Sequence, residues 1–203
     1  MVEYMIKEQL KEILMSEDVV KSINNNIDEL LTIIPEIRDM MGFEHKNPQH
    51  HLDVWEHTLL SLSFSPVDFK LRLILLLHDI GKPHSCQDGE IRHFKGHQIA
   101  SSEIAEKILT RLKFNKEEIE EMCYLIKKHD TLITQNAIED NKQLALMRFK
   151  IQVCDGLSHN PLMLEKRIEY LLKINDNINE GEERKKYWEQ ITSIKNAPKS
   201  KKH

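Results

Sequence analysis

The chain has 203 residues, enough for one domain with a sizeable core or for two small ones. Of these residues 40% are hydrophobic and 31% charged, as is typical of a folded soluble protein. Its formal net charge of -4 argues against a protein that coats nucleic acid through bulk positive charge. The 3 cysteines form no CxxC pair, and we find neither a signal-peptide pattern nor an apolar run long enough to span a membrane, so we expect a cytoplasmic protein.

Apolar residues recur at helical spacing along most of the chain, and no alternating strand pattern is present. Capping residues and prolines divide this pattern into segments; Asp18 and the Asn115/Glu118 pair, for example, are typical of helix starts. Helices are expected at about residues 3–15, 19–34, 36–41, 54–64, 71–80, 96–113, 116–129, 141–156, 161–173 and 182–195. The sequence therefore predicts an all-α protein, most simply a single domain.

The stretch from Leu71 to Pro83 is almost wholly apolar until it reaches the pair His78-Asp79. Gly81 fits the left-handed position just past a helix end, and Pro83 cannot continue a helix, so the pair is expected in the last turn of a buried helix. Burying a carboxylate beside an imidazole is costly unless something compensates both. A divalent metal ion would do so, and a His–Asp hydrogen bond in the core is the alternative.

Four more residues of ligand type fall at helix ends or beside apolar helix faces: His57, His97, His129 and Asp155. Taken singly, each is more often a core or surface residue than a metal ligand. Their order along the chain, a His, then His-Asp, then a distal Asp, instead favours metal ligands.

In this order the residues resemble the HD-domain superfamily of metal-dependent phosphohydrolases, in particular the HD domain fused to bacterial CCA-adding tRNA nucleotidyltransferases and its stand-alone relatives. The similar stretches are residues 34–37, 50–59, 77–83, 94–97 and 155–161, within a region of about residues 27–161. A Gly-Ser motif followed by paired aspartates is missing, so the resemblance implies a hydrolytic module without nucleotide addition.

The resemblance implies a single HD-domain helical bundle over residues 1–203. Residues 45–161 would be the metal-binding core, between N-terminal helices in 1–44 and C-terminal helices in 162–195. It also implies two divalent metal ions, drawn from Mn, Fe, Co, Ni or Zn. His57, His78, Asp79 and Asp155 would hold one ion. Asp79 would bridge to a second ion, held by His97 and His129.

Lys82 follows the His-Asp pair and, by the same resemblance, would hold a phosphate oxygen or steady the leaving group; the alternative is a solvated lysine near a helix C-terminus.

Several further residues near these motifs are candidates for the substrate pocket or its surroundings. His50 and His51 would line the substrate entrance or serve the loop structurally, and Arg148 and Lys150 would lie on the surface, with binding of a substrate phosphate as the alternative. Three more histidines are candidates for the pocket wall: His84, His93 and His159.

The function implied is a metal-dependent phosphohydrolase, a phosphodiesterase or phosphomonoesterase, with Asp79 and Lys82 as catalytic residues. Its substrate would be a nucleotide, a cyclic nucleotide or an RNA end, cleaved by metal-activated water, with RNA a further candidate partner. The alternatives are a non-catalytic RNA-binding or regulatory module with a structural metal site, and an inert helical adaptor. A (p)ppGpp hydrolase is disfavoured, because the expected Glu-Asp pair is missing between His84 and Gly96.

Overall fold

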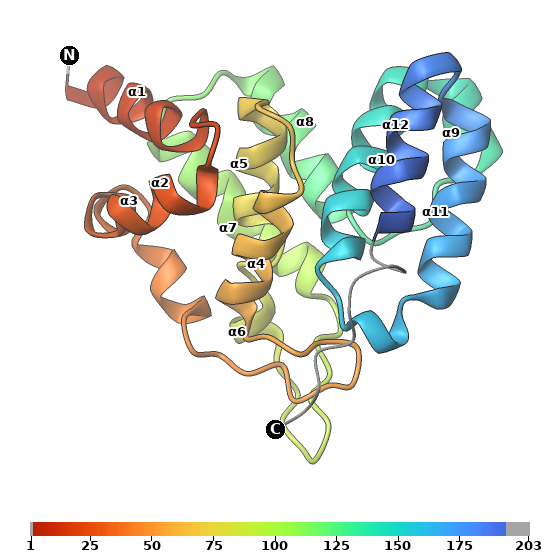
Figure 1. The fold of residues 1–203 in the computed structure, drawn as a ribbon. Helices are drawn as coiled ribbons and strands as arrows, with labels where there is room; N and C mark the ends of the chain where they lie inside the picture. The colour runs from red at the N-terminus through yellow and green to blue at the C-terminus, as the bar shows by residue number, and fades with distance from the viewer. Residues whose placement is uncertain (1, 194–203) are drawn as a thin grey trace.

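The computed structural model describes residues 2–193, with side chains from residue 5, and this part of the chain is built from α-helices and short 3-10 turns without a strand (Figure 1). Two isolated β-bridges join Glu44 to Asp53 and Gln87 to His93. The all-α fold class is therefore confirmed. None of the described helices is long and apolar enough to cross a membrane.

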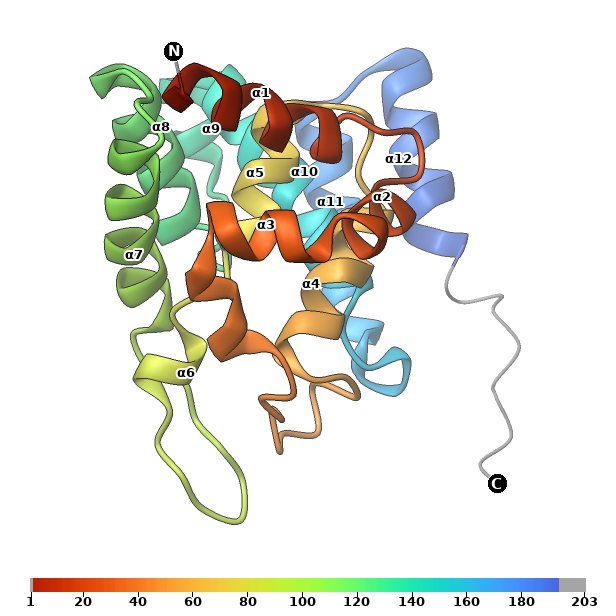
Figure 2. The same ribbon diagram turned by 90° about the vertical axis from the view of Figure 1, so that its left-hand side faces the viewer.

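The first part of the chain forms a group of helices around α4 and α5. Its elements are α1 (Val2–Leu14), α2 (Val19–Asn25), α3 (Ile27–Ile33), η1 (Pro35–Met40), α4 (Val54–Ser63), α5 (Phe69–Leu77), α6 (Lys82–Ser85), α7 (His97–Arg111) and α8 (Lys116–Lys127). Helices α1 to α3 lie across α4 and α5, as Figure 2 shows. One large hydrophobic cluster fills the space between these elements.

The second part forms a smaller group that packs around its own hydrophobic cluster. Its elements are α9 (Gln135–Asp140), α10 (Lys142–Leu157), η2 (Pro161–Met163), α11 (Glu165–Ile178) and α12 (Gly181–Ser193). Helix α10 belongs to both groups, since Ile151 and Cys154 enter the first cluster while Phe149 and Val153 enter the second. This shared helix places Asp155 where the two groups meet. The division of residues 1–203 at 44/45 and 161/162 stays a prediction.

Helix α5 is the buried centre of the fold, and every residue from Leu71 to Leu77 is buried. Asp68 caps its start by accepting from the Leu71 backbone N–H. The expectation for its end was wrong: Gly81 has φ -85°, not a left-handed conformation, and Pro83 lies in the first turn of the next helix, α6. Glycine is needed here because a Cβ at position 81 would lie 2.3 Å from the backbone nitrogen of Ser101 on α7.

We expect Gly81→Ala to lower the free energy of unfolding by about 1–3 kcal/mol, the usual cost of overpacking. The added Cβ would meet backbone atoms of Ala100 and Ser101 and the Cβ of Ala100, none of which can swing aside. Urea denaturation measures this change. Gly89→Ala is the matched control, because its Cβ would meet only Ile91 O at 3.4 Å. Equal stability of the two variants would show that α6 and α7 can separate without cost.

Several other element predictions need correction. The helix expected over 19–34 is broken at Asn26, whose side chain donates to the Ser22 carbonyl and whose backbone leaves the helical region. Helix α9 was missed, and the helix expected from Pro161 begins at Glu165 after the 3-10 turn η2. The end of the helix expected to Lys195 and the tail with His203 lie outside the described residues.

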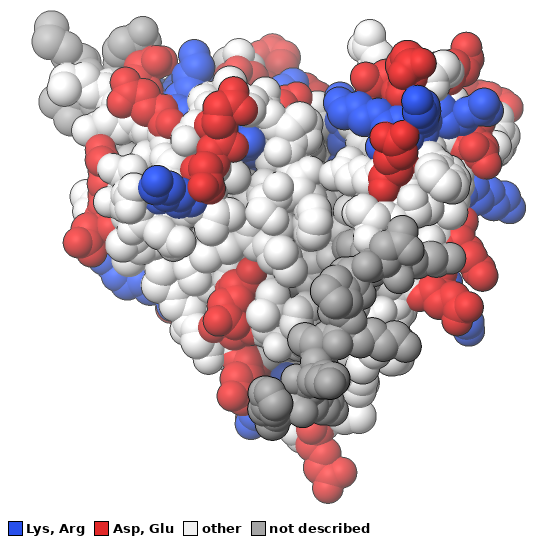
Figure 3. Space-filling model, viewed as in Figure 1, with Lys and Arg blue, Asp and Glu red and all other residues white. Residues whose placement is uncertain are grey.

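The basic run Arg184-Lys185-Lys186 follows two glutamates in α12, and all five residues are exposed. On the face drawn in Figure 3, basic side chains over α12 are interspersed with acidic ones. This arrangement is typical of solvated surface charge.

Candidate metal centre

Five elements bring the six predicted ligand residues together. His57 lies in α4, which opens with a capping box between Asp53 and Glu56. The other five lie at or near helix ends: His78 and Asp79 directly after α5, His97 at the first position of α7, His129 just after α8, and Asp155 near the end of α10. All are buried except His97, whose side chain is 12% exposed.

The first cluster consists of His57, His78, Asp79 and Asp155. The Nε2 atom of His57 lies 3.1 Å from Asp155 Oδ1 and 3.4 Å from Asp79 Oδ2. The Nε2 atom of His78 lies 3.2 Å from Asp79 Oδ2 and 3.7 Å from Asp155 Oδ1. Two imidazole nitrogens and two carboxylate oxygens thus face one small space.

The second cluster consists of Asp79, His97 and His129. The other oxygen of Asp79, Oδ1, lies 3.4 Å from His97 Nε2 and 3.8 Å from His129 Nε2. The two Nε2 atoms are 3.4 Å apart. Asp79 therefore presents one oxygen to each cluster, which is the arrangement expected of a bridging carboxylate.

Backbone carbonyls fix the orientation of three of the histidine rings. The Nδ1 atoms of His78, His97 and His129 lie 2.7, 2.8 and 2.7 Å from the carbonyl oxygen three residues earlier in each case. Because a carbonyl only accepts hydrogen bonds, Nδ1 of each ring carries a hydrogen, and Nε2 is the ring atom that faces the carboxylates. Metal-ligating histidines usually have this support, with Nε2 left to bind the ion.

The donor set fits divalent metal ions. Among the described residues, His78 Nε2 and both oxygens of Asp79 are buried without a hydrogen-bond partner, although the Lys82 ammonium lies 2.6 Å from Oδ2. Buried polar atoms of this kind are rare unless a ligand or ion satisfies them. Imidazole nitrogen and carboxylate oxygen together suit Mn, Fe, Co, Ni and Zn.

The buried carboxylates and basic groups of the site shift one another's pKa values. Burial by itself would raise the pKa of Asp79, yet His78 and Lys82 outweigh it and hold that pKa well below its usual range. Burial lowers the pKa of His129 to about 4, so this ring is neutral at pH 7, as a ligand must be. Burial would also lower the pKa of His78, but the carboxylates of Asp79 and Asp155 raise it to about 10. A cation that binds His78 must therefore displace a proton.

Lys82 is not the solvated lysine of the alternative interpretation, because it is only 4% exposed. Its ammonium lies 2.6 Å from Asp79 Oδ2 and donates to His45 Nε2 at 3.0 Å. His45 can accept because its Nδ1 atom lies 2.8 Å from the Leu52 carbonyl and so carries the ring hydrogen. Nothing in the sequence around His45 distinguishes it from a loop histidine, so the sequence predicts no role for it in the site.

A pocket of about 430 Å³ opens over both clusters and contains Asp79, Lys82, His97, His129 and Asp155 in its lining. His159, a candidate for the pocket wall, lines this pocket, and so does His50; the centroids of the two rings lie 4.4 Å apart. The other three histidine candidates, His51, His84 and His93, are exposed and lie outside its lining.

Two arginines have roles that the sequence did not indicate. Arg148, expected on the surface, is buried and donates from Nη2 to the carbonyls of Thr131 and Leu132, just after His129. Arg167 lines the pocket and donates to Asp155 Oδ2 at 3.3 Å. It lies beyond residue 161, where the expected metal-binding core ended, so its contact with the site had no local signal.

Comparison with known proteins agrees with this geometry. The model of the HD domain family matches residues 49–168. A CC-adding tRNA nucleotidyltransferase of Thermus thermophilus is 31% identical, and an A-adding tRNA nucleotidyltransferase of Deinococcus radiodurans 32% identical, each over 134 residues. Each match covers 61% of this chain but only 31% of the relative's length. The resemblance inferred from the sequence is confirmed.

Proposed function

Because the chain belongs to the HD domain family, whose members are typically metal-dependent phosphohydrolases, we propose that it hydrolyses a phosphate ester at the two clusters described above. The observation that carries this proposal is Asp79, which offers one oxygen to each cluster in a pocket shared with Lys82. The substrate would be a nucleotide, a cyclic nucleotide or an RNA end. RNA is included because the relatives are tRNA nucleotidyltransferases by name.

The ligand roles follow the two clusters. His57, His78, Asp79 and Asp155 would hold one ion, and Asp79, His97 and His129 a second, weaker one with fewer protein ligands. Such ions would lower the pKa of a water and offset the charge of the phosphate. Arg167, which donates to Asp155 Oδ2 at 3.3 Å, would keep the Asp155 carboxylate ionised and in place, while His159, whose Nδ1 lies 3.6 Å from Asp155 Oδ1, packs beside it.

Hydrolysis forms a bond from the water oxygen to phosphorus and breaks the ester P–O bond, and the leaving oxygen takes up a proton. Lys82 is the protein cation closest to Asp79, and it lines the same pocket. Its ammonium would stabilise the negative charge that develops on the phosphate or on the leaving oxygen. Asp79 and His45 hold this ammonium from two sides, which limits its movement before substrate arrives.

The test is to strip the purified protein with a chelator and to screen phosphate monoesters and diesters with added Mn, Co or Ni. We expect hydrolysis only in the presence of a metal. A protein that binds metal and RNA but hydrolyses none of the esters would favour the alternative, an RNA-binding or regulatory module with a structural metal site. A purified protein that holds no metal would favour an inert adaptor.

The second ion can be separated from the first by removing its dedicated ligands. In a calorimetric titration with Mn, stripped wild type should bind two ions and the His97→Ala, His129→Ala variant one, with hydrolysis lost alongside the second ion. The matched control is the His84→Ala, His93→Ala variant, because both of these histidines are exposed and lie outside the pocket. Full activity of wild type with a single ion would contradict the two-metal arrangement.

A further inference from the structure

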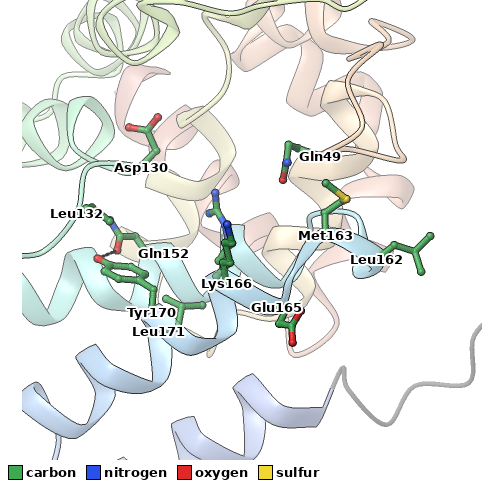
Figure 4. A pocket seen from close by; sticks show the side chains of 11 residues that line it. Gln49, Asp130, Leu132, Gln152, Leu162, Met163, Glu165, Lys166, Tyr170 and Leu171 are labelled. Carbon is green, nitrogen blue, oxygen red and sulfur yellow. Dashed lines mark hydrogen bonds between the residues drawn. The ribbon is translucent and has the colours of Figure 1, made fainter.

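A second pocket, of about 550 Å³, adjoins the metal centre. It lies between the turn η2 with the start of α11 and the segment that follows His129, and we refer to it as the side pocket (Figure 4). Gln49, Asp130 and Arg167 line both this pocket and the one over the metal clusters. One ligand could therefore occupy both.

The walls of the side pocket combine apolar surface with polar groups. Figure 4 shows Gln49 and Met163 on one side and Leu132, Gln152 and Tyr170 on the other. Leu132 is 66% exposed and Met163 45% exposed, so both side chains offer apolar surface to a ligand in this pocket. The volume also falls within the range of about 300–1,000 Å³ that is typical of small-molecule sites.

One wall is fixed by hydrogen bonds before any ligand binds. Arg148 and Gln152, both on α10, donate to the carbonyl of Thr131 at 2.8 and 2.7 Å. The Tyr170 hydroxyl on α11 accepts from the Ile133 backbone N–H at 2.8 Å and donates to Gln152 at 2.9 Å. The segment that carries Leu132 is thus tied to two helices, so binding requires little ordering of this wall.

We propose that the side pocket binds the organic part of the phosphate ester, a nucleoside or a similar flat ring with polar edges, while the phosphate lies at the metal centre. This inference rests on the proposed function and adds the site that selects the substrate. Leu132 and Met163, from opposite sides of the pocket, would contact the apolar surface of the organic part. Gln49 and Asp130 would pair with its polar edges. Arg167, at the border of the two pockets, has the guanidinium geometry suited to a phosphate oxygen.

The test compares two probes by calorimetric titration of the metal-loaded protein: inorganic phosphate, and a phosphonate analogue of adenosine 5′-monophosphate in which a methylene group replaces the ester oxygen, so that hydrolysis cannot consume the nucleotide. Wild type should bind the nucleotide more tightly than phosphate. In the Leu132→Ser, Met163→Ser variant the affinity for the nucleotide should fall about tenfold or more, the scale of apolar pocket contacts, while the affinity for phosphate stays unchanged. The matched control is Val67→Ser. Val67 is also exposed, but it lies just before the N-terminal end of α5, whereas His78 and Asp79 of the metal centre follow the C-terminal end.

Serine adds no charge that would repel phosphate, and both replaced side chains are exposed, so the fold should persist; circular dichroism verifies this. Equal affinity of wild type for nucleotide and phosphate, or an unchanged nucleotide affinity in the variant, would overturn the inference. Selective loss of nucleotide affinity in a protein that hydrolyses no ester would support the side pocket and refute the proposed hydrolysis. The two proposals can therefore fail separately.

Discussion

Replacing Asp79 with asparagine should reduce phosphate-ester hydrolysis by about 10³-fold or more while leaving the helical content unchanged. Asparagine has nearly the same shape as aspartate but lacks the negative charge that would offset two cations. Asp79 is also the only one of the six candidate ligands that belongs to both clusters. Steady-state kinetics, metal analysis and circular dichroism of the variant test this expectation.

The control for this variant is Asp39→Asn. Asp39 is exposed and its carboxylate pairs with His84 Nε2 at 3.3 Å, outside the pocket over the clusters. This control should keep both its metal content and its turnover. Retained turnover of Asp79→Asn with an unchanged metal content would exclude a mechanism centred on this carboxylate.

Removing the ammonium of Lys82 should slow turnover by about 10²–10³-fold, or roughly 3–4 kcal/mol of transition-state stabilisation, without emptying the metal site. The metal site should survive because Lys82 offers no lone pair while protonated and because its loss leaves Asp79 more negative. Since Lys82 is buried, Lys82→Ala leaves a cavity, whereas Lys82→Met fills most of the same volume without charge. Both variants should lose turnover alike in steady-state assays.

The comparison of these two variants separates charge from packing. If Lys82→Met were as fast as wild type and only Lys82→Ala were slow, the contribution of Lys82 would be packing against Asp79 and His45. If both variants were as fast as wild type, Lys82 would have no part in the reaction.

The parts of the fold that could be predicted from sequence are those with a local cause. The apolar run of α5, the Asp18 cap and the capping box of Asn115 with Glu118 were all predicted, and each depends on residues within one or two helical turns. The break at Asn26 was missed, because an asparagine within an apolar periodicity is also compatible with a continuous helix.

The prediction of a left-handed helix end at Gly81 was wrong because it used only the residues next to it in the chain. A glycine followed by proline after an apolar helix is typical of a left-handed helix end. The structure instead uses the missing Cβ for the approach of Ser101, twenty residues later on α7. No pattern within one helix contains that information.

The residues of the candidate site also fall into two groups: those that the sequence pattern indicated and those that only the fold brings to the site. The spacing of His57, His78, Asp79 and Asp155 led to the family, and the structure brings all four together. His45 and Arg167 were missed because each touches the site only through the fold, by way of Lys82 and Asp155. Arg148 was misplaced because an arginine beside a helix face is usually solvated, and its carbonyl partners lie on a different segment.

We propose one centre for two metal ions that share Asp79, formed by His57, His78, Asp79, His97, His129 and Asp155. Anomalous diffraction from crystals of active protein grown with Mn tests it most directly. We expect two anomalous peaks, one on either side of the Asp79 carboxylate. One peak should contact His57, His78 and Asp155, and the other His97 and His129. Crystals of active protein with no anomalous peak at Asp79 would contradict it.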